Sequence, residues 1–311
     1  MADLYTSGAA NFNLQLTELV EEAFERAGRE LRSGYDLKTA RRSLNIMFAD
    51  WANRGVNMWT IEQGTIDLVQ GQNTYALPDD TVDLLEHVIR TQANQQNNQA
   101  DLTITRISVS TYATLPNKLQ QSRPIQVWIQ RLNGMLSPVS ATLASPISAT
   151  DTTITVTNAT GLPAAGFVKI GNEVINYGYI TGSTLNNCFR GQDNTTAAAH
   201  LAAVPVYWYQ VPCISVWPTP DGSQPYQFVY WRLRRTQDGG GGTNVMDVPF
   251  RFIPCMAAGL SYYIAGKIPE GFERLQVLKT QYDEAWELAA GEDHEKAALR
   301  LVPRQQFIGG G

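Results

Sequence analysis

Apolar side chains recur every three or four residues in four stretches of the chain, which is the pattern of a helix with one buried face. In the second stretch, Asp36 is expected to cap the helix start and Gly55 to follow its end. Thr17 is expected to cap the first helix. Pro249 and Pro269 are expected to open the last two, because the first turn of a helix leaves its N–H groups unpaired. The pattern therefore predicts four amphipathic helices.

The apolar positions of these four helices form the predicted helical core. In chain order they are Leu16, Leu19, Val20, Ala23, Phe24, Ala27, Leu37, Ala40, Leu44, Met47, Phe48, Trp51, Phe250, Ile253, Met256, Ala257, Leu260, Tyr263, Ile264, Phe272, Leu275, Leu278, Tyr282, Ala285, Trp286 and Leu288. The opposite face of the second helix is polar and largely basic, with Lys38, Arg41, Arg42, Asn45 and Asp50. We interpret that face as solvated surface.

Elsewhere the apolar residues alternate with polar ones, which predicts β-strands. Residues 66–77 are expected to form one β-hairpin around a turn at 70–73. Residues 213–235 are expected to form a second, longer hairpin around a Pro- and Gly-rich turn. Further strands are predicted at residues 82–90 and 125–131. The helices and hairpins together predict an α+β protein, an α-helical bundle with β-hairpins or a small antiparallel sheet.

The composition changes sharply within this framework. Residues 136–206 carry almost no charge and contain many Thr, Ala and Gly residues in short β-branched runs, which predicts a small all-β domain inserted into the parent fold. The predicted organisation is therefore a core in two parts, residues 1–135 and 207–311, with the inserted domain at residues 136–206 between them. Gly239–Gly242 is interpreted as a flexible linker in the second part.

Composition and charge reduce the number of functional classes to which the protein could belong. Lys and Arg total 24 against 29 Asp and Glu, a formal net charge of −5. A nucleic-acid binder needs a dense basic face to displace the counterions of phosphates, so this balance argues against that class. The three cysteines are scattered, with no CxxC pair, and the first residues lack a signal-peptide pattern. We expect a soluble protein made in a cytoplasm, with reduced thiols and no membrane segment.

No motif in the sequence points to catalysis, to a metal or to a cofactor. His87, His200 and His294 form no HExxH or other ligand spacing, and the chain has no P-loop, no GxSxG and no dinucleotide-binding motif. His294 lies in an acidic run, which we interpret as a solvated helix end. The adjacent Asp79 and Asp80 are more typical of a turn than of a two-carboxylate hydrolase. We therefore predict a protein without enzyme activity.

Four segments carry a resemblance to a known family. They read DLKTARRSLNIMFADWANRGVNMWTIEQGTIDLVQGQNTYALP, ISVWPTPDGSQPYQFVYWRLRRTQD, VPFRFIPCMAAGLSYYIAGK and YDEAWELAAGEDHEKAALRLVPR. Their ordered series resembles the head-to-tail adaptors of short-tailed bacteriophages, also called tail accessory or packaged-DNA stabilisation proteins. Residues 140–207 look like a separate β-module of phage tail and baseplate proteins, and the plain adaptor pattern lacks such an insertion.

The resemblance implies a structural protein of the virion neck. Such adaptors form a homo-oligomeric, twelvefold ring on the portal protein, extend the DNA channel, help to retain the genome and provide the platform for the tail nozzle protein. Packaged double-stranded DNA would pass through the lumen without sequence-specific binding. Residues 136–206 would face tail fibres or neighbouring subunits. The C-terminal tail would dock on the portal through Arg300, Leu301, Val302, Arg304, Phe307 and Ile308.

Two other classes of protein stay open at this stage. A β-rich tail adhesin would use the inserted module to bind carbohydrate, and a cell-wall hydrolase would need a pair of carboxylates. The strand at 226–235 mixes aromatic and basic side chains, a composition that also suits stacking on single-stranded bases. Its strict alternation favours a half-buried strand instead.

Overall fold

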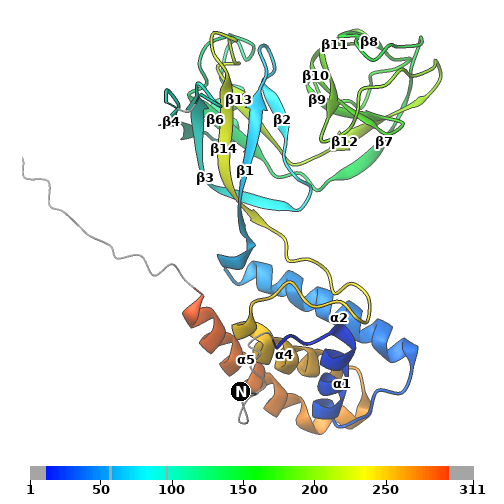
Figure 1. Ribbon diagram of the computed structural model, residues 1–311. Coiled ribbons are helices and arrows are strands. Elements are labelled where there is room, and N and C mark those ends of the chain that lie inside the picture. The colour runs from blue at the N-terminus through cyan, green and yellow to red at the C-terminus, as the bar shows by residue number, and fades with distance from the viewer. Residues whose placement is uncertain (1–11, 56–57, 96, 294–311) are drawn as a thin grey trace, which may run out of the picture. The chain divides into compact units, whose positions relative to one another are not determined.

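The structure is a computed structural model that describes residues 12–55, 58–95 and 97–293. The chain divides into two compact units (Figure 1): unit 1 comprises residues 1–60 and 236–311, and unit 2 comprises residues 61–235. Five α-helices and fourteen strands, in three largely antiparallel sheets, are present in the described residues. The predicted α+β class is confirmed, whereas a helical bundle is not evident as the main architecture. The three-part division predicted from composition stays a prediction.

Four helices and three 3-10 turns build unit 1. The helices are α1 (Leu16–Ala27), α2 (Gly34–Asn53), α4 (Ile253–Ala265) and α5 (Leu275–Glu292), and the turns are η1 (Met58–Thr60), η2 (Phe250–Phe252) and η3 (Pro269–Arg274). One hydrophobic core joins the helices, and it contains all the predicted apolar positions of α1 and nearly all those of α2. Trp51 lies fully buried in this core, where its indole Nε1 donates a hydrogen bond to the Tyr282 hydroxyl at 2.8 Å.

Three residues predicted for this core are exposed instead: Phe250, Phe272 and Leu288. The first two lie in 3-10 turns, where three residues per turn carry side chains off the stripe that an α-helical period predicts. Leu288 lies in α5, where the buried line runs through Leu278 and Ala289. At about 100° per residue, Leu288 falls about 80° away from Leu278 around the helix.

Two helix starts also differ from the prediction. Ser33, not Asp36, is the N-cap of α2, and its hydroxyl accepts a hydrogen bond from the Asp36 amide at 3.3 Å. Asp36 is instead the third residue of the helix, within its first turn, and its carboxylate accepts a hydrogen bond from the Arg29 guanidinium at 2.7 Å. Thr17 does not cap α1, which begins one residue earlier. Gly55 does follow the C-cap of α2, with a φ of +145° that favours glycine.

Unit 2 contains two four-stranded sheets that share a core. The first has the order β1 (Ile61–Leu68), β14 (Tyr226–Arg234), β3 (Thr81–Thr91) and β4 (Ala100–Thr103), and the second has the order β2 (Thr74–Ala76), β13 (Cys213–Trp217), β6 (Gln126–Gln130) and β5 (Thr105–Arg106). Val127, Ile214 and Phe228 are among the fully buried residues that join them. A short helix, α3 (Val109–Ala113), begins after Ser108, whose hydroxyl caps it.

Both predicted hairpins are wrong, because consecutive strands enter different sheets. β1 pairs with β14 and β2 pairs with β13, so neither β1 with β2 nor β13 with β14 forms a ladder. The turn between β1 and β2, which carries the chain from one sheet to the other, is stabilised by the Tyr75 hydroxyl. This hydroxyl accepts a hydrogen bond from the Val69 amide at 2.9 Å and donates one to the Gln72 carbonyl at 2.9 Å. The second crossing contains Pro218, Pro220 and Pro225, which lack the N–H that a tight hairpin ladder requires.

A six-stranded sheet forms the rest of unit 2, with a hydrophobic core of its own. Its order is β7 (Met135–Thr142), β12 (Pro205–Gln210), β9 (Gly166–Ile170), β10 (Glu173–Thr181), β11 (Thr184–Gln192) and β8 (Ile154–Thr155). β7 and β12 are its first and last strands in the sequence, and they pair so that Met135 lies opposite Gln210. The chain therefore enters and leaves this sheet at adjacent points.

Candidate functional site

The residues predicted to dock on a portal lie outside the described part of the chain. They are Arg300, Leu301, Val302, Arg304, Phe307 and Ile308. Among the described residues of unit 1, helix α2 has an outward face that packs on no other helix, and this face is a candidate binding surface.

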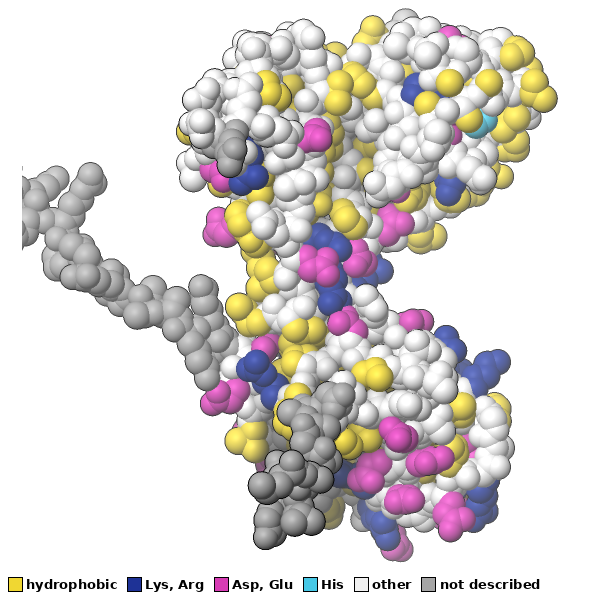
Figure 2. Space-filling view, in the orientation of Figure 1, with side chains coloured by type: hydrophobic (Ala, Val, Ile, Leu, Met, Phe, Trp, Pro, Cys, Tyr) yellow, Lys and Arg dark blue, Asp and Glu magenta, His cyan; other side chains and the backbone are white. Residues whose placement is uncertain are grey.

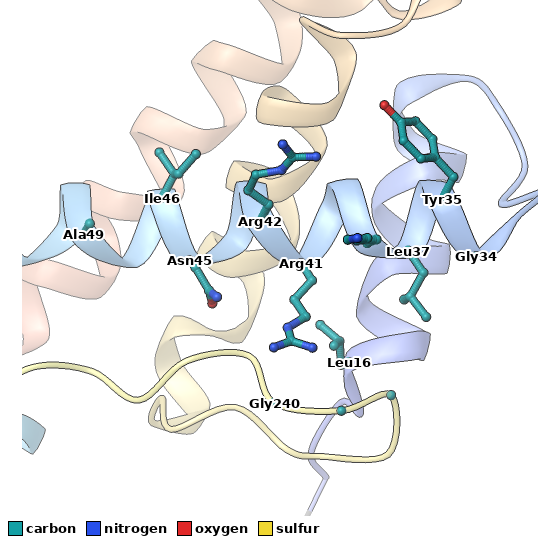
Figure 3. A pocket seen from close by; sticks show the side chains of 13 residues that line it. Leu16, Gly34, Tyr35, Leu37, Arg41, Arg42, Asn45, Ile46, Ala49 and Gly240 are labelled. Carbon is teal, nitrogen blue, oxygen red and sulfur yellow. The ribbon is translucent and has the colours of Figure 1, made fainter.

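A groove of about 880 Å³ follows this outer face of α2 (Figure 3). We call it the basic groove, and it is lined by Leu16, Gly34, Tyr35, Leu37, Lys38, Arg41, Arg42, Asn45, Ile46, Ala49 and Gly240–Gly242. Figure 3 shows Arg41 and Asn45 pointing toward the segment that carries Gly240, whereas Tyr35, Arg42 and Ile46 project on the other side of the helix. The groove thus combines α2, the start of α1 and a glycine-rich loop.

Exposed apolar side chains lie toward both ends of the basic groove, and its cationic side chains lie between them. Tyr35 is 73% exposed and Ile46 is 51% exposed, although both are large apolar residues. Lys38 and Arg42 form no ion pair within the described residues, and Arg41 reaches only one carboxylate, Asp238, at 4.0 Å. A positive surface with exposed apolar side chains suits an acidic partner that also has apolar contacts to offer.

The charge of Arg42 also affects the residues beneath it. Burial, with a further contribution from Arg42, lowers the pKa of the Lys267 ammonium. Lys267 Nζ donates a hydrogen bond to the Ser43 hydroxyl at 2.6 Å, which ties α2 to the end of α4. Lys267 is thus a further cationic side chain close to the face that carries Arg42.

The glycine-rich loop is a packed part of the site, so its interpretation as a flexible linker is wrong. The carbonyl of Gly242 accepts from both the backbone amide of Thr17 at 3.0 Å and its hydroxyl at 2.9 Å. The Gly239 amide donates to Asn45 Oδ1 at 2.9 Å. A Cβ placed on Gly242 would lie 2.9 Å from Thr17 Oγ1. Glycine is needed here because the loop passes close to α1 and caps its start.

Sequence reasoning found the charges of this groove but missed its apolar side chains. Lys38, Arg41 and Arg42 are exposed, as predicted for a solvated face. Tyr35 and Ile46 were not part of that prediction, yet a signal was available. They are eleven residues apart, which is about three helical turns and places them on one face.

A second pocket, of about 430 Å³, lies within unit 2 and is rich in aromatic side chains. The rings of Tyr112 and Trp128 stack at a centroid distance of 4.6 Å, and Tyr179 and Trp208 also line the pocket. Lys118 Nζ lies 5.5 Å from the centre of the Tyr112 ring. Flat aromatic surfaces with a nearby polar group can hold sugar rings or other flat, partly apolar ligands.

The titratable residues considered from the sequence make separate structural contacts. Asp79 accepts a hydrogen bond from the Tyr209 hydroxyl at 2.9 Å, whereas Asp80 forms an ion pair with Arg232. His200 Nε2 lies 2.8 Å from a carboxylate oxygen of Glu173. His294 lies outside the described residues. Across residues 12–293, apart from the short gaps, no group of three or more His, Cys, Asp and Glu side chains is placed to hold a metal ion.

Cys188, Cys213 and Cys255 are buried and free, as predicted. No helix among the described residues has both the length and the apolar composition to cross a membrane.

The chain matches no protein-family model and no curated protein. A functional proposal for this protein therefore depends on its own sequence and surfaces.

Proposed function

We propose that the protein is a structural virion protein, a head-to-tail adaptor of a short-tailed bacteriophage. In this role it forms a twelvefold ring that binds the portal, extends the DNA channel, helps to retain the packaged genome and provides the attachment platform for the tail nozzle. It acts without catalysis and without a cofactor. The basic groove on α2 is the observation that carries this proposal, together with the ordered series of segments that resembles this family.

The basic groove supports a docking role through its composition. Large apolar side chains that stay exposed on a helix, on either side of a group of cationic residues, suit a surface that a protein partner covers. Neither Tyr35 nor Ile46 belongs to the hydrophobic core of unit 1, and at least half of each side chain is exposed. A docked protein would remove them from water and neutralise the charges of Lys38 and Arg42.

The net charge also fits a DNA conduit. A channel lined by many cations would hold a duplex through counterion release and would slow ejection. The chain instead has five more acidic than basic residues. In the proposed ring, DNA passes through the lumen without sequence-specific contacts.

The decisive experiment mixes the full chain with the portal protein and images the product by negative-stain electron microscopy. We expect rings of twelve copies seated on the portal vertex. A variant that lacks residues 299–311 should keep its thermal transition but lose portal binding. Normal portal binding by this truncated chain would show that the predicted tail, with Arg300 and Arg304, does not dock.

The six-stranded sheet is proposed to lie outside the ring, toward tail fibres or neighbouring subunits. Its ends are adjacent, because Met135 pairs with Gln210. Residues 135–210 can therefore be replaced by a short glycine linker with little strain on the flanking strands. We expect the shortened chain to form rings on the portal, and the loss of rings in a folded variant would contradict a peripheral position.

One observation favours a second function, that of a carbohydrate-binding tail adhesin. The aromatic pocket of unit 2 offers the stacked Tyr112 and Trp128 together with Trp208. A glycan array probed with the full chain tests this function, with Trp208→Ala as the variant that should lose any signal. Binding that survives this substitution would place the glycan elsewhere.

A further inference from the structure

Unit 1 has a second groove, on the outer face of α1, with the opposite charge. This groove, of about 430 Å³, is called the acidic groove and is lined by Phe12, Leu14, Glu18, Glu21, Glu22, Glu25, Arg26, Ile253, Pro254 and Ala257. Figure 2 shows acidic side chains gathered over α1. Phe12 adds a large apolar side chain that is 62% exposed. The acidic groove therefore has an apolar floor and an anionic rim.

Among the described residues, most carboxylates of the acidic groove are not neutralised by an ion pair. Glu22 is paired with Arg26 at 2.6 Å, and Glu18 Oε2 accepts the Gln15 amide at 2.9 Å. Glu21 and Glu25 form no ion pair in the part of the chain that the structure describes. These two carboxylates lie four residues apart, one helical turn, so they extend from the same side of α1.

We propose that the two grooves bind each other between copies, so that the basic groove of one copy takes the acidic groove of the next. This inference rests on the proposed ring and names the contact that builds it. Arg42 and Lys38 of one copy pair with Glu21 and Glu25 of its neighbour. Apolar contact between the exposed Tyr35 and Ile46 on one side and Phe12 on the other completes the interface.

The dimensions of the two surfaces agree. Glu18 and Glu25 are seven residues apart, about 10 Å along α1 at 1.5 Å per residue. Tyr35 and Ile46 are eleven residues apart, about 16 Å along α2. The carboxylates therefore fit between the two apolar residues that bound the basic groove, where the cationic side chains lie.

The two grooves share no lining residue, so one copy can use both at once. A contact between two different surfaces is heterologous, and repeated heterologous contacts produce a ring when the rotation between copies closes. Each exposed ion pair is weak and is screened by salt. The assembly should therefore be salt-sensitive, and it should gain strength when the ring closes on the portal.

Charge reversal in the full-length protein tests the pairing. The α2 variant carries Lys38→Glu, Arg41→Glu and Arg42→Glu, and the α1 variant carries Glu18→Lys, Glu21→Lys and Glu25→Lys. A third protein carries all six substitutions. The matched control reverses the exposed Lys279 on α5, outside both grooves, in Lys279→Glu. Circular dichroism and the thermal transition establish that each variant is folded.

Sedimentation velocity at low salt measures self-association, and electron microscopy counts the rings formed with the portal. We expect each of the two triple variants alone to associate at least tenfold more weakly than the wild type, and the control to match the wild type. A mixture of the two triple variants, and the sixfold variant alone, should recover assembly, because each again presents opposite charges.

The outcomes separate this contact from the proposed function. If both triple variants form rings on the portal as well as the wild type does, the proposed contact is wrong and the adaptor role is unaffected. Rescue of association by the mixture, without any binding to the portal, would support the contact and refute the adaptor role. The contact is also wrong if the mixture of the two triple variants does not assemble, or if the wild type does not self-associate in either assay. It is wrong as well if the wild type stops at a dimer, because a heterologous contact allows further copies to add.

Discussion

At Gly259 helix α4 lies close to side chains of both α2 and α5, and replacement of this glycine by alanine is a sharp test of the packing. Gly259 is buried in α4 between α2 and α5. A Cβ at this position would lie 2.5 Å from Met47 Sδ and 2.7 Å from Cε2 of the Tyr282 ring. A Cβ does not approach non-bonded atoms to less than 3.0 Å in proteins, so Gly259→Ala must move a neighbour.

The two neighbours differ in their ability to move. The unbranched thioether of Met47 can change its rotamer at small cost. The Tyr282 ring cannot turn away without losing the 2.8 Å hydrogen bond that its hydroxyl accepts from Trp51. Overpacking of this kind costs about 1–3 kcal/mol, and alanine recovers only about 0.5–1 kcal/mol of helix propensity over glycine. The net expectation for Gly259→Ala is a loss of about 1–2 kcal/mol of unfolding free energy.

Gly291 provides the matched control in the same unit. It lies near the end of α5, and among the described residues a Cβ there would meet nothing within 4 Å beyond the backbone of its own helix. Gly291→Ala should therefore keep or raise stability, by at most about 1 kcal/mol. Urea unfolding of both variants, followed by tryptophan fluorescence and circular dichroism, measures the difference. Equal stability of Gly259→Ala and wild type, or an equal loss in both variants, would refute the packing described for α4.

Three further predictions concern buried polar groups. Tyr282→Phe leaves the Trp51 indole N–H buried without its acceptor and should cost about 1–3 kcal/mol in urea unfolding. Glu173 is buried and paired with Arg190 at 2.7 Å, so Glu173→Gln should destabilise unit 2 by about 3–5 kcal/mol in the same assay. Burial alone would raise the pKa of Glu173, but the hydrogen bonds from Arg190 hold that pKa below its usual range. The ionised carboxylate therefore contributes stability above about pH 4.3, and this contribution should be lost as the pH falls further. Burial lowers the pKa of His87, so below about pH 6.5 the unfolded chain binds a proton at this residue before the folded chain does. The melting temperature should therefore fall as the pH decreases below about 6.5. His87→Leu should reduce this dependence of the melting temperature on pH.

Each of these three has an outcome that contradicts it. Tyr282→Phe with wild-type stability would mean that the Trp51 N–H finds another acceptor. An acid profile of Glu173→Gln that still parallels the wild type would place the titrating carboxylate elsewhere in the chain. A melting temperature that is flat between about pH 5.5 and pH 7.5 in the wild type would mean that His87 is protonated in the folded state as readily as in the unfolded one.

The helices were predictable because their signal is local. The stripe from Leu16 to Ala27 is contained in twelve residues, and the structure buries every predicted member of it. The errors lie at the ends, where the deciding partner is distant in sequence. The Thr17 amide is satisfied by the carbonyl of Gly242, and no pattern near Thr17 reveals that partner.

The sheets were harder to predict for the same reason. Alternation identified the strand at 226–235, and the structure places it in the middle of a sheet. Alternation gives no information on which strand pairs with which, and the proximity of β13 in the sequence suggested a hairpin that does not exist. The true neighbours of β14 are β1 and β3, which lie more than a hundred residues earlier in the chain.

The same limit applies to the surface of α2. The periodic pattern correctly predicted which side of this helix is buried, but it did not predict the exposed apolar residues on the opposite side. The side of the helix that carries Leu44 and Trp51 builds the core, so the opposite side was assigned to solvent. A helix in a monomer gains nothing from keeping Tyr35 and Ile46 exposed there, because burying such side chains is favourable wherever a partner surface exists. The helical period reports which side faces the chain's own core. Exposed apolar residues on the other side, together with an uncompensated charge, are what we expect of a helix that packs against the helices of its own unit and, in the proposed ring, also against a neighbouring copy.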